Sequence, residues 1–407
     1  MSGETHACMQ PDSPAAWRRL ALCVAVCAAG GVGMWSIVVA LPAVQADFGV
    51  ARGLASAPYT LTMISFAVGG VYMGRIADRR GVVAAILLGA VVMAAGYALT
   101  ALARNFALFA LFQGVLVGFG SSATFAPLVA DISHWFERRR GIAVAICAAG
   151  NYLAGVVWPP VLQHFIAADG WRATHAGAAV FSLVALPLLA TLLRRGEDSA
   201  HAGASQIAQP ARLLDSGLPL PVLQALLVVA GVACCVAMSM PQVHIVAYCG
   251  DLGYGPARGA EMLSLMLGFG IVSRIASGFL ADRIGGVPTL LVGSFLQGVA
   301  LLLYTLFDSL GALYVISALF GLFQGGIVPS YAIIVREYFD AKEAGARVGA
   351  VIMATLFGMA FGGWGSGWLF DLTGNYHAAF VNGLAWNLLN VSIASFLLTR
   401  SRRMQTA

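Results

Sequence analysis

Charged residues are scarce in this sequence. Only 10% of its 407 residues are Asp, Glu, Lys or Arg, whereas soluble domains carry about 25%. A soluble protein of this length could not cover its surface with so few charges. The composition therefore excludes a disordered chain, a coiled coil, a secreted disulfide scaffold and a nucleic-acid-binding protein. Hydrophobic residues make up 59%, which indicates an integral membrane protein.

Patterns that would hold a metal, a cofactor or a catalytic group are also missing. The 7 cysteines fall mostly inside apolar runs and share no ligand-like spacing with histidine, so we interpret them as small buried hydrophobic residues. No Walker loop or dinucleotide-binding glycine motif is present. We therefore expect no metal, no cofactor and no enzyme, and the absence of an output domain argues against a sensor.

Twelve apolar runs are long enough to cross a membrane as helices, which takes roughly 20 residues each. They form two groups of six, at 19–44, 58–77, 82–103, 106–132, 141–166 and 173–193, and at 218–248, 261–280, 287–307, 310–335, 345–369 and 378–399. We predict an all-α membrane protein of twelve transmembrane helices in two pseudo-symmetric bundles, 18–194 and 218–400. An N-terminal tail (1–17), a linker (195–217) and a C-terminal tail (401–407) complete the chain.

The basic residues of the connections are unevenly distributed. With the N-terminus in the cytoplasm, 18 of the 23 Lys and Arg residues fall on the cytoplasmic side and 4 on the other. This bias predicts cytoplasmic termini and a cytoplasmic linker, in the inner (plasma) membrane of the cell. The Arg18–Arg19 pair before an apolar run is similar to a signal peptide, but the run exceeds the 7–15 residues of a signal, so we expect no cleavage.

The two halves share a repeated sequence. The segment 74–81, G-R-I-A-D-R-R-G, recurs over 278–285 as G-F-L-A-D-R-I-G, 204 residues later. The segment 135–137, W-F-E, recurs 203 residues later as Y-F-D over 338–340. Two matches with polar residues in almost the same register predict a duplicated six-helix unit. Duplicated halves are typical of secondary transporters, whose substrate site lies between the repeats near the middle of the membrane.

The repeated G-x-x-x-D-R-x-G loop resembles the signature of the major facilitator superfamily. The resemblance covers the chain after about residue 17 and implies that fold and transport by alternating access. It also implies that Gly74 allows close helix packing and that Asp78 faces the base of the fourth helix. We interpret this region as a conformational latch, formed by Gly74, Asp78, Arg79, Asp131, Asp282 and Arg283. The alternative is a loop that only fixes topology through its arginines.

One basic residue lies deep in an apolar run. Arg274 precedes Asp282 by eight residues, hence by about 12 Å along a helix. An arginine in the bilayer is costly, and its guanidinium fits a carboxylate bidentately. We therefore interpret Arg274 as an anion-binding residue in a wet cavity, the alternative being a side chain that snorkels or binds backbone carbonyls. No acidic residue lies in the middle of a run, so no carboxylate proton relay is visible.

The position of Arg274 resembles one branch of the superfamily, the monocarboxylate carriers and the oxalate–formate exchangers, which have an arginine just before the second signature loop. Segments 135–141 and 241–253 are also similar to this branch. Two features differ: Gly270 replaces an acid found in many eukaryotic members, and the run 345–369 lacks the lysine of oxalate exchangers. The resemblance therefore implies a singly charged carboxylate such as lactate or pyruvate, moved by proton symport or by anion exchange.

Polar and aromatic residues on the helices that face the centre in this fold complete the predicted substrate site. It comprises Arg274, Tyr59, Asn151, His244, Gln324 and Tyr331. Packing or helix–helix hydrogen bonding is the alternative for each of them. His244 follows a Pro-Gln pair, and histidine titrates in the range that suits proton exchange; a surface position near the outer end is its alternative.

Export of apolar drugs or metabolites is the alternative function. Arg274 argues against it, and so does the fifth helix, which has Trp158-Pro-Pro160 instead of the Gly-Pro-Gly-Gly pattern of drug–proton antiporters. The expected partners are a small carboxylate, protons where transport is proton-coupled, and the lipid bilayer. We expect a monomer that binds no nucleic acid.

Overall fold

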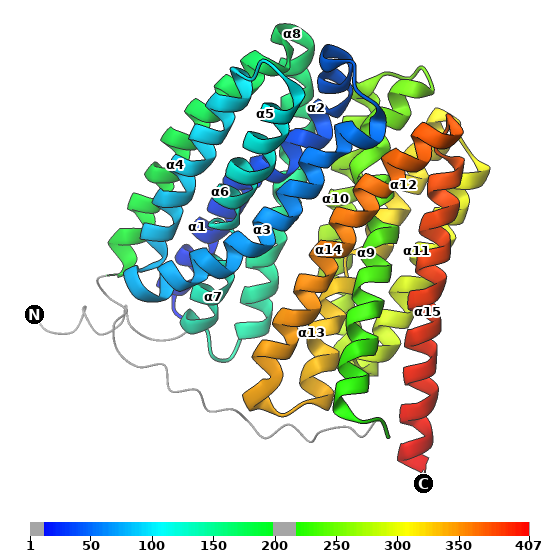
Figure 1. Ribbon diagram of the computed structural model, residues 1–407. Coiled ribbons are helices and arrows are strands. Elements are labelled where there is room, and N and C mark those ends of the chain that lie inside the picture. The colour runs from blue at the N-terminus through cyan, green and yellow to red at the C-terminus, as the bar shows by residue number, and fades with distance from the viewer. Residues whose placement is uncertain (1–11, 198–216, 407) are drawn as a thin grey trace, which may run out of the picture. The chain divides into compact units, whose positions relative to one another are not determined.

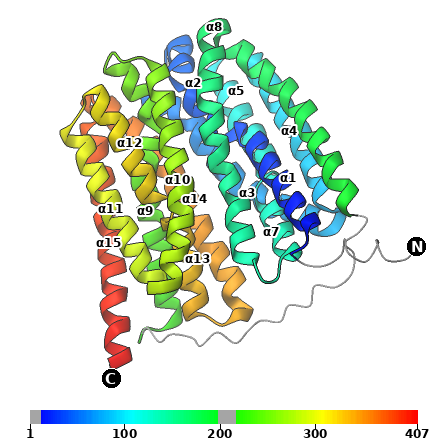
Figure 2. The same ribbon diagram turned by 180° about the vertical axis from the view of Figure 1, so that it is seen from behind.

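The computed structural model describes residues 12–197 and 217–406, and Figures 1 and 2 show it from two sides. Helices form nearly all of this part of the chain. The first half contains α1 (Pro14–Gly30), α2 (Val32–Phe48), α3 (Arg52–Arg80), α4 (Val82–Ala101), α5 (Phe106–Leu111), a π-helical turn (Phe112–Val117), α6 (Gly118–Ser122), α7 (Ala126–Trp135) and α8 (Arg140–Glu197). The second half contains α9 (Leu220–Asp251), α10 (Pro256–Ile284), α11 (Gly286–Leu306), α12 (Leu310–Gln324), α13 (Ile327–Tyr338), α14 (Ala341–Thr373) and α15 (His377–Thr406).

Eleven helical stretches in the described residues are long and apolar enough to cross a membrane. The longest, α8, has 58 residues, which is about 87 Å of helix and too long for one crossing. Gly170 interrupts it with φ 81° and ψ 163°, a conformation that only glycine adopts readily. Gly170 therefore divides α8 into two crossings, which gives twelve. The prediction of an all-α membrane protein is confirmed.

The described residues divide into two compact units. The first contains residues 12–48 and 57–197, and the second contains 49–56 and 217–406. Segment 49–56 follows the first crossing in sequence but belongs to the second unit. Most of the predicted linker (195–217) lies outside the described residues, as do residues 1–11 of the N-terminal tail and residue 407.

The repeated loop has the same backbone conformation in both units. Gly81 lies between α3 and α4 with φ 85° and ψ 157°, and Gly285 lies between α10 and α11 with φ 87° and ψ 168°. Each is the last glycine of the repeated segment, and each allows a sharp turn between two crossings that a residue with a Cβ could not make without strain. The two repeated segments therefore end in the same turn geometry.

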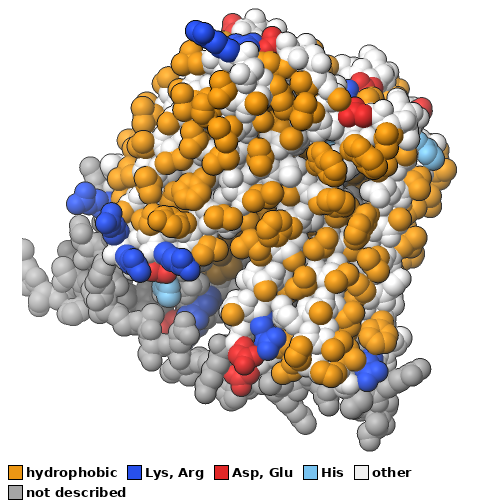
Figure 3. Space-filling model, viewed as in Figure 1, with side chains coloured by type: hydrophobic (Ala, Val, Ile, Leu, Met, Phe, Trp, Pro, Cys, Tyr) orange, Lys and Arg blue, Asp and Glu red, His pale blue; other side chains and the backbone are white. Residues whose placement is uncertain are grey.

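Each unit is held together by apolar packing and a few buried polar contacts. In the first unit, α1 and α4 pack against α8, and the Tyr97 hydroxyl donates a hydrogen bond to Ser36 (2.8 Å). In the second unit, α9 packs against α14, α10 against α12, and α11 against α15. Large apolar side chains such as Val180, Phe279 and Phe295 are more than half exposed. Figure 3 shows many such side chains on one face of the molecule, as expected of a surface solvated by lipid.

Candidate functional site

Arg274 lies on α10 with a half-buried side chain. Close backbone packing fixes the helix at this point, because a Cβ on Gly325 would lie 2.8 Å from the Cβ of Ser273. One turn of helix away, a Cβ on Gly321 would lie 2.7 Å from the carbonyl carbon of Met266. The end of α12 therefore sets the position of the α10 face next to Arg274.

Gln324 occupies the last turn of α12, directly before Gly325. Its Oε1 atom accepts a hydrogen bond from Gln242 Nε2 of α9 (2.8 Å), and both side chains are buried. The Nε2 atom of Gln324 has no hydrogen-bond acceptor among the described residues. A buried amide with an unused N–H can donate to a ligand oxygen, and this one lies where α9, α10 and α12 meet.

His244 is fully buried on α9, so the alternative surface position is wrong. Its Nε2 atom lies 2.8 Å from the carbonyl oxygen of Gly363 on α14. Its Nδ1 atom lies 2.9 Å from the hydroxyl of Tyr376, between α14 and α15. A carbonyl only accepts hydrogen bonds, so Nε2 carries the ring proton and, in the neutral ring, Nδ1 accepts from Tyr376.

Sequence reasoning missed the charged group beside His244. Arg52 Nη1 donates a hydrogen bond to the oxygen of Tyr376 (2.6 Å), and the guanidinium binds both oxygens of Asp251 at 3.0 Å. The backbone N–H groups of Arg52 and Gly53 donate to Asp371 at 2.8 and 2.7 Å. Arg52 is 7% exposed. We call Arg52, Asp251, Asp371, Tyr376 and His244 the Arg52 cluster; all five belong to the second unit.

The remaining predicted substrate residues lie in different surroundings. Tyr331 is buried, and its hydroxyl donates to Asn390 Oδ1 of α15 (2.9 Å), a bond between helices. In the first unit, Asn151 Nδ2 lies 3.6 Å from Met34 Sδ, and Tyr59 is 2% exposed. The second unit thus contains Arg274, His244, Gln324 and Tyr331, and the first contains Tyr59 and Asn151.

The residues predicted to form the latch are divided between the two units: the first contains Gly74, Asp78, Arg79 and Asp131, and the second contains Asp282 and Arg283. Asp131 binds Arg19 of α1 through both carboxylate oxygens (2.7 and 2.9 Å). Asp78, Arg79, Asp282 and Arg283 are exposed. A Cβ on Gly74 would meet no heavy atom within 4 Å, so the close packing expected at this glycine is not seen. Asp131 is therefore paired within the first unit, with the arginine at the start of the first apolar run.

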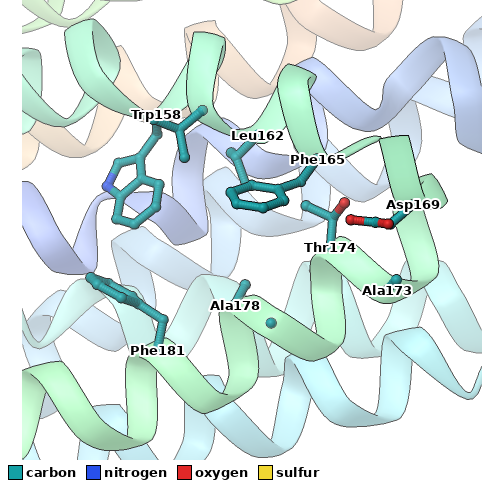
Figure 4. Close-up of a pocket in the computed structure, with 10 residues that line it drawn as sticks. Trp158, Leu162, Phe165, Asp169, Ala173, Thr174, Ala178 and Phe181 are labelled. Carbon is teal, nitrogen blue, oxygen red and sulfur yellow. The ribbon is translucent and has the colours of Figure 1, made fainter. Parts of the chain in front are cut away.

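A separate pocket of about 400 Å³ lies in the first unit between the two arms of α8. Figure 4 shows its lining, with Trp158 and Leu162 on one arm and Phe181 on the other. Asp169 contributes the single charged side chain among its lining residues. No predicted substrate residue lines this pocket. Among the described residues, no group of three or more His, Cys, Asp or Glu side chains could hold a metal ion.

A known family model matches most of this chain. The family model described as Major Facilitator Superfamily matches residues 21–312 and 251–406. This chain belongs to the major facilitator superfamily. It is therefore a multi-pass membrane protein of a transporter family, as the repeated loop predicted.

Relatives within the superfamily include two monocarboxylate transporters and an efflux protein. Monocarboxylate transporter 13 of Bos taurus is 31% identical over 301 residues, which cover 73% of this chain and 69% of that protein. Its counterpart in Rattus norvegicus is 30% identical over 300 residues, or 73% and 68%. The agnestins efflux protein AgnL12 of Paecilomyces divaricatus is 24% identical over 281 residues, or 69% and 63%. The similarity to the monocarboxylate carrier branch is confirmed.

The fold also matches a solved structure. A bacterial homolog of the human lysosomal transporter Spinster, in an inward-facing and occupied conformation, superimposes with a TM-score of 0.72 over 96% of this chain and 98% of the other. The sequences are only 14% identical, so this likeness supports the superfamily fold and gives no information about the substrate.

Proposed function

We propose that this protein transports a small monocarboxylate, such as lactate or pyruvate, by alternating access. The observation that carries the proposal is Arg274, a cation placed within the apolar span of α10 and held there by packing against α12. Two monocarboxylate transporters among the relatives support the same substrate class. We further propose that the protein lies in the cell's inner (plasma) membrane as a monomer with both termini in the cytoplasm.

The residues of the site favour a substrate with a single negative charge. A guanidinium binds a carboxylate through two parallel hydrogen bonds, and Arg274 supplies one such fork. The free N–H of Gln324 is a further donor for a carboxylate or hydroxyl oxygen. Gly270 stands one turn before Arg274, where an acid would compete for the guanidinium. One cation without an acid in that position suits a monoanion better than a dianion.

Export of an apolar metabolite is the second candidate, because a fungal efflux protein is also among the relatives. The two functions differ in their need for Arg274. A monocarboxylate carrier requires the guanidinium to compensate the substrate charge, whereas an exporter of neutral apolar compounds does not.

Uptake of labelled lactate and pyruvate into proteoliposomes, with and without a pH gradient, tests the proposal. We expect Arg274→Gln to lower uptake by at least about tenfold, the effect of losing roughly 1.4 kcal/mol of binding. Arg274→Lys keeps the charge but loses the planar fork, so its uptake should be intermediate. Arg104→Gln is the matched control because it removes an exposed arginine. Carboxylate uptake that is unchanged in Arg274→Gln would overturn the anion site and favour the export function.

A further inference from the structure

A chain of hydrogen bonds links Arg52 to Gly363, and each group in it donates to the next. Arg52 donates to the Tyr376 oxygen, the Tyr376 hydroxyl donates to His244 Nδ1, and His244 Nε2 donates to the Gly363 carbonyl. Burial raises the pKa of Tyr376 above its usual value, so the hydroxyl keeps its proton at neutral pH. Each bond therefore fixes the orientation of the next, and the chain requires a neutral His244.

A proton from water can bind this histidine only at Nδ1, because Nε2 is already protonated. Both ring nitrogens would then be donors, and Nδ1–H would face the hydroxyl proton of Tyr376. The hydroxyl would have to rotate, and its oxygen would then accept from the imidazolium as well as from Arg52. Two cations donating to one oxygen repel each other strongly in a buried setting.

We propose that Arg52 is the positioning residue that keeps His244 neutral, and that a proton on His244 releases Arg52 together with segment 49–56 from its contacts with α9 and α14. The inference rests on the proposed function, to which it assigns the group that takes a co-transported proton. The coupling is reciprocal: if the contact of Arg52 with Tyr376 disfavours the proton, then the proton disfavours that contact by the same free energy.

In the described part of the chain, two carboxylates of the cluster and one tyrosine beside it are the other ionisable groups near His244. Asp251 binds the guanidinium of Arg52, and Asp371 accepts from the backbone of segment 49–56. Tyr248 packs edge-on against the Tyr376 ring, with ring centroids 5.6 Å apart. Both carboxylates hold segment 49–56 in place, so a test must separate their contribution from that of the imidazole.

Hydrogen–deuterium exchange of the full-length protein in nanodiscs gives this separation without any substrate. The amides of Arg52 and Gly53 are protected by Asp371, so exchange in a peptide covering 49–56 reports release of the segment. After correction for intrinsic exchange, we expect protection to fall about tenfold between about pH 8 and about pH 4, because the contact with Arg52 opposes the proton on His244.

Three variants decide between the groups. His244→Gln should remove most of the change in protection, because a glutamine side chain does not take up the proton while both aspartates are kept. Tyr376→Phe should have the same effect, since the ring nitrogen and Arg52 are no longer connected. His164→Gln, which removes an exposed histidine, should behave like the wild type.

The inference fails if wild-type protection does not depend on pH, or if His244→Gln keeps the full dependence. Because exchange needs no transported substrate, either failure would leave the carboxylate proposal untouched. Conversely, an absence of lactate and pyruvate uptake would not alter the exchange result.

Discussion

Arg19 and Arg274 both lie in helices, but the residues around the two guanidinium groups differ. Arg19 is 4% exposed, binds both oxygens of Asp131 and lies over the ring of Trp135 at 4.6 Å. A carboxylate of the protein itself thus balances this charge. Arg274 is half-buried on α10, with an amide donor at the neighbouring helix junction. At the scale of single residues, Arg19 therefore has a structural role, whereas we propose that Arg274 binds the transported anion.

The Arg19–Asp131 pair predicts a large stability difference between two aspartates. Asp131→Asn would leave the buried Arg19 charge without its counter-ion, which costs about 3–5 kcal/mol for buried pairs, so the protein should unfold at a clearly lower temperature. Asp78→Asn is the control, because Asp78 is exposed; its melting temperature should match the wild type. Thermal unfolding in detergent measures both. Equal melting temperatures for the two variants would contradict a structural role of the pair.

The surroundings of His175 predict that replacing this residue stabilises the protein. Its ring is buried among Tyr97, Phe109 and Trp171, with centroids 5.4, 5.9 and 5.5 Å away. Neither ring nitrogen has a hydrogen-bond partner among the described residues, and such a group costs about 1–3 kcal/mol.

Replacement by phenylalanine keeps the aromatic contacts and removes this cost. We therefore expect His175→Phe to raise the melting temperature, whereas the exposed His164→Phe should leave it unchanged. A fall in melting temperature for His175→Phe would mean that the imidazole is bonded through a group such as an ordered water.

At the scale of helices and their connections, the glycines of the repeated loops fall into two classes. Gly81 and Gly285 have positive φ values at sharp turns. Gly74 and Gly278 lie within helices, where an added Cβ would meet nothing within 4 Å. The backbone conformation therefore requires glycine at positions 81 and 285. Packing within the described residues does not require glycine at positions 74 and 278.

This contrast predicts opposite effects of alanine within one motif. Gly81→Ala and Gly285→Ala should each lower stability by about 1–3 kcal/mol because of backbone strain. Gly74→Ala and Gly278→Ala should be neutral or stabilise by up to about 1 kcal/mol, the helix-propensity gain. Melting temperatures of the four variants provide the measurement. Loss of transport in Gly74→Ala with unchanged stability would instead support the latch interpretation.

The sequence predicted the crossings well because an apolar run of about 20 residues has few alternatives to a spanning helix. It did not predict the partners of charged residues. Arg19 contacts Asp131 over 112 positions and Arg52 contacts Asp251 over 199, and one sequence carries no information about which distant residues meet. The predicted topology did place Arg52, Asp251 and Asp371 on the same side of the membrane, which was the available signal for the Arg52 cluster.

At the scale of the whole molecule, orientation in the membrane follows from the distribution of basic residues. Reporter fusions after Ala200 and Ala407 should both be active as cytoplasmic reporters, because the positive-inside rule places the linker and the C-terminus on that side. A fusion after Arg104, in a connection that the same rule predicts to lie on the other side, serves as the control and should give the opposite signal. A non-cytoplasmic signal from Ala200 would overturn the proposed topology.

Segment 49–56 belongs to the second unit but precedes most of the first unit in the sequence. A C-terminal fragment that begins near Gly217 would lack Arg52, so Asp251 and Asp371 would lose the cation and the backbone N–H donors that they bind. Co-expression with an N-terminal fragment would return these groups from a separate chain. The two halves of the chain are therefore unequal, because the second half depends on eight residues encoded in the first.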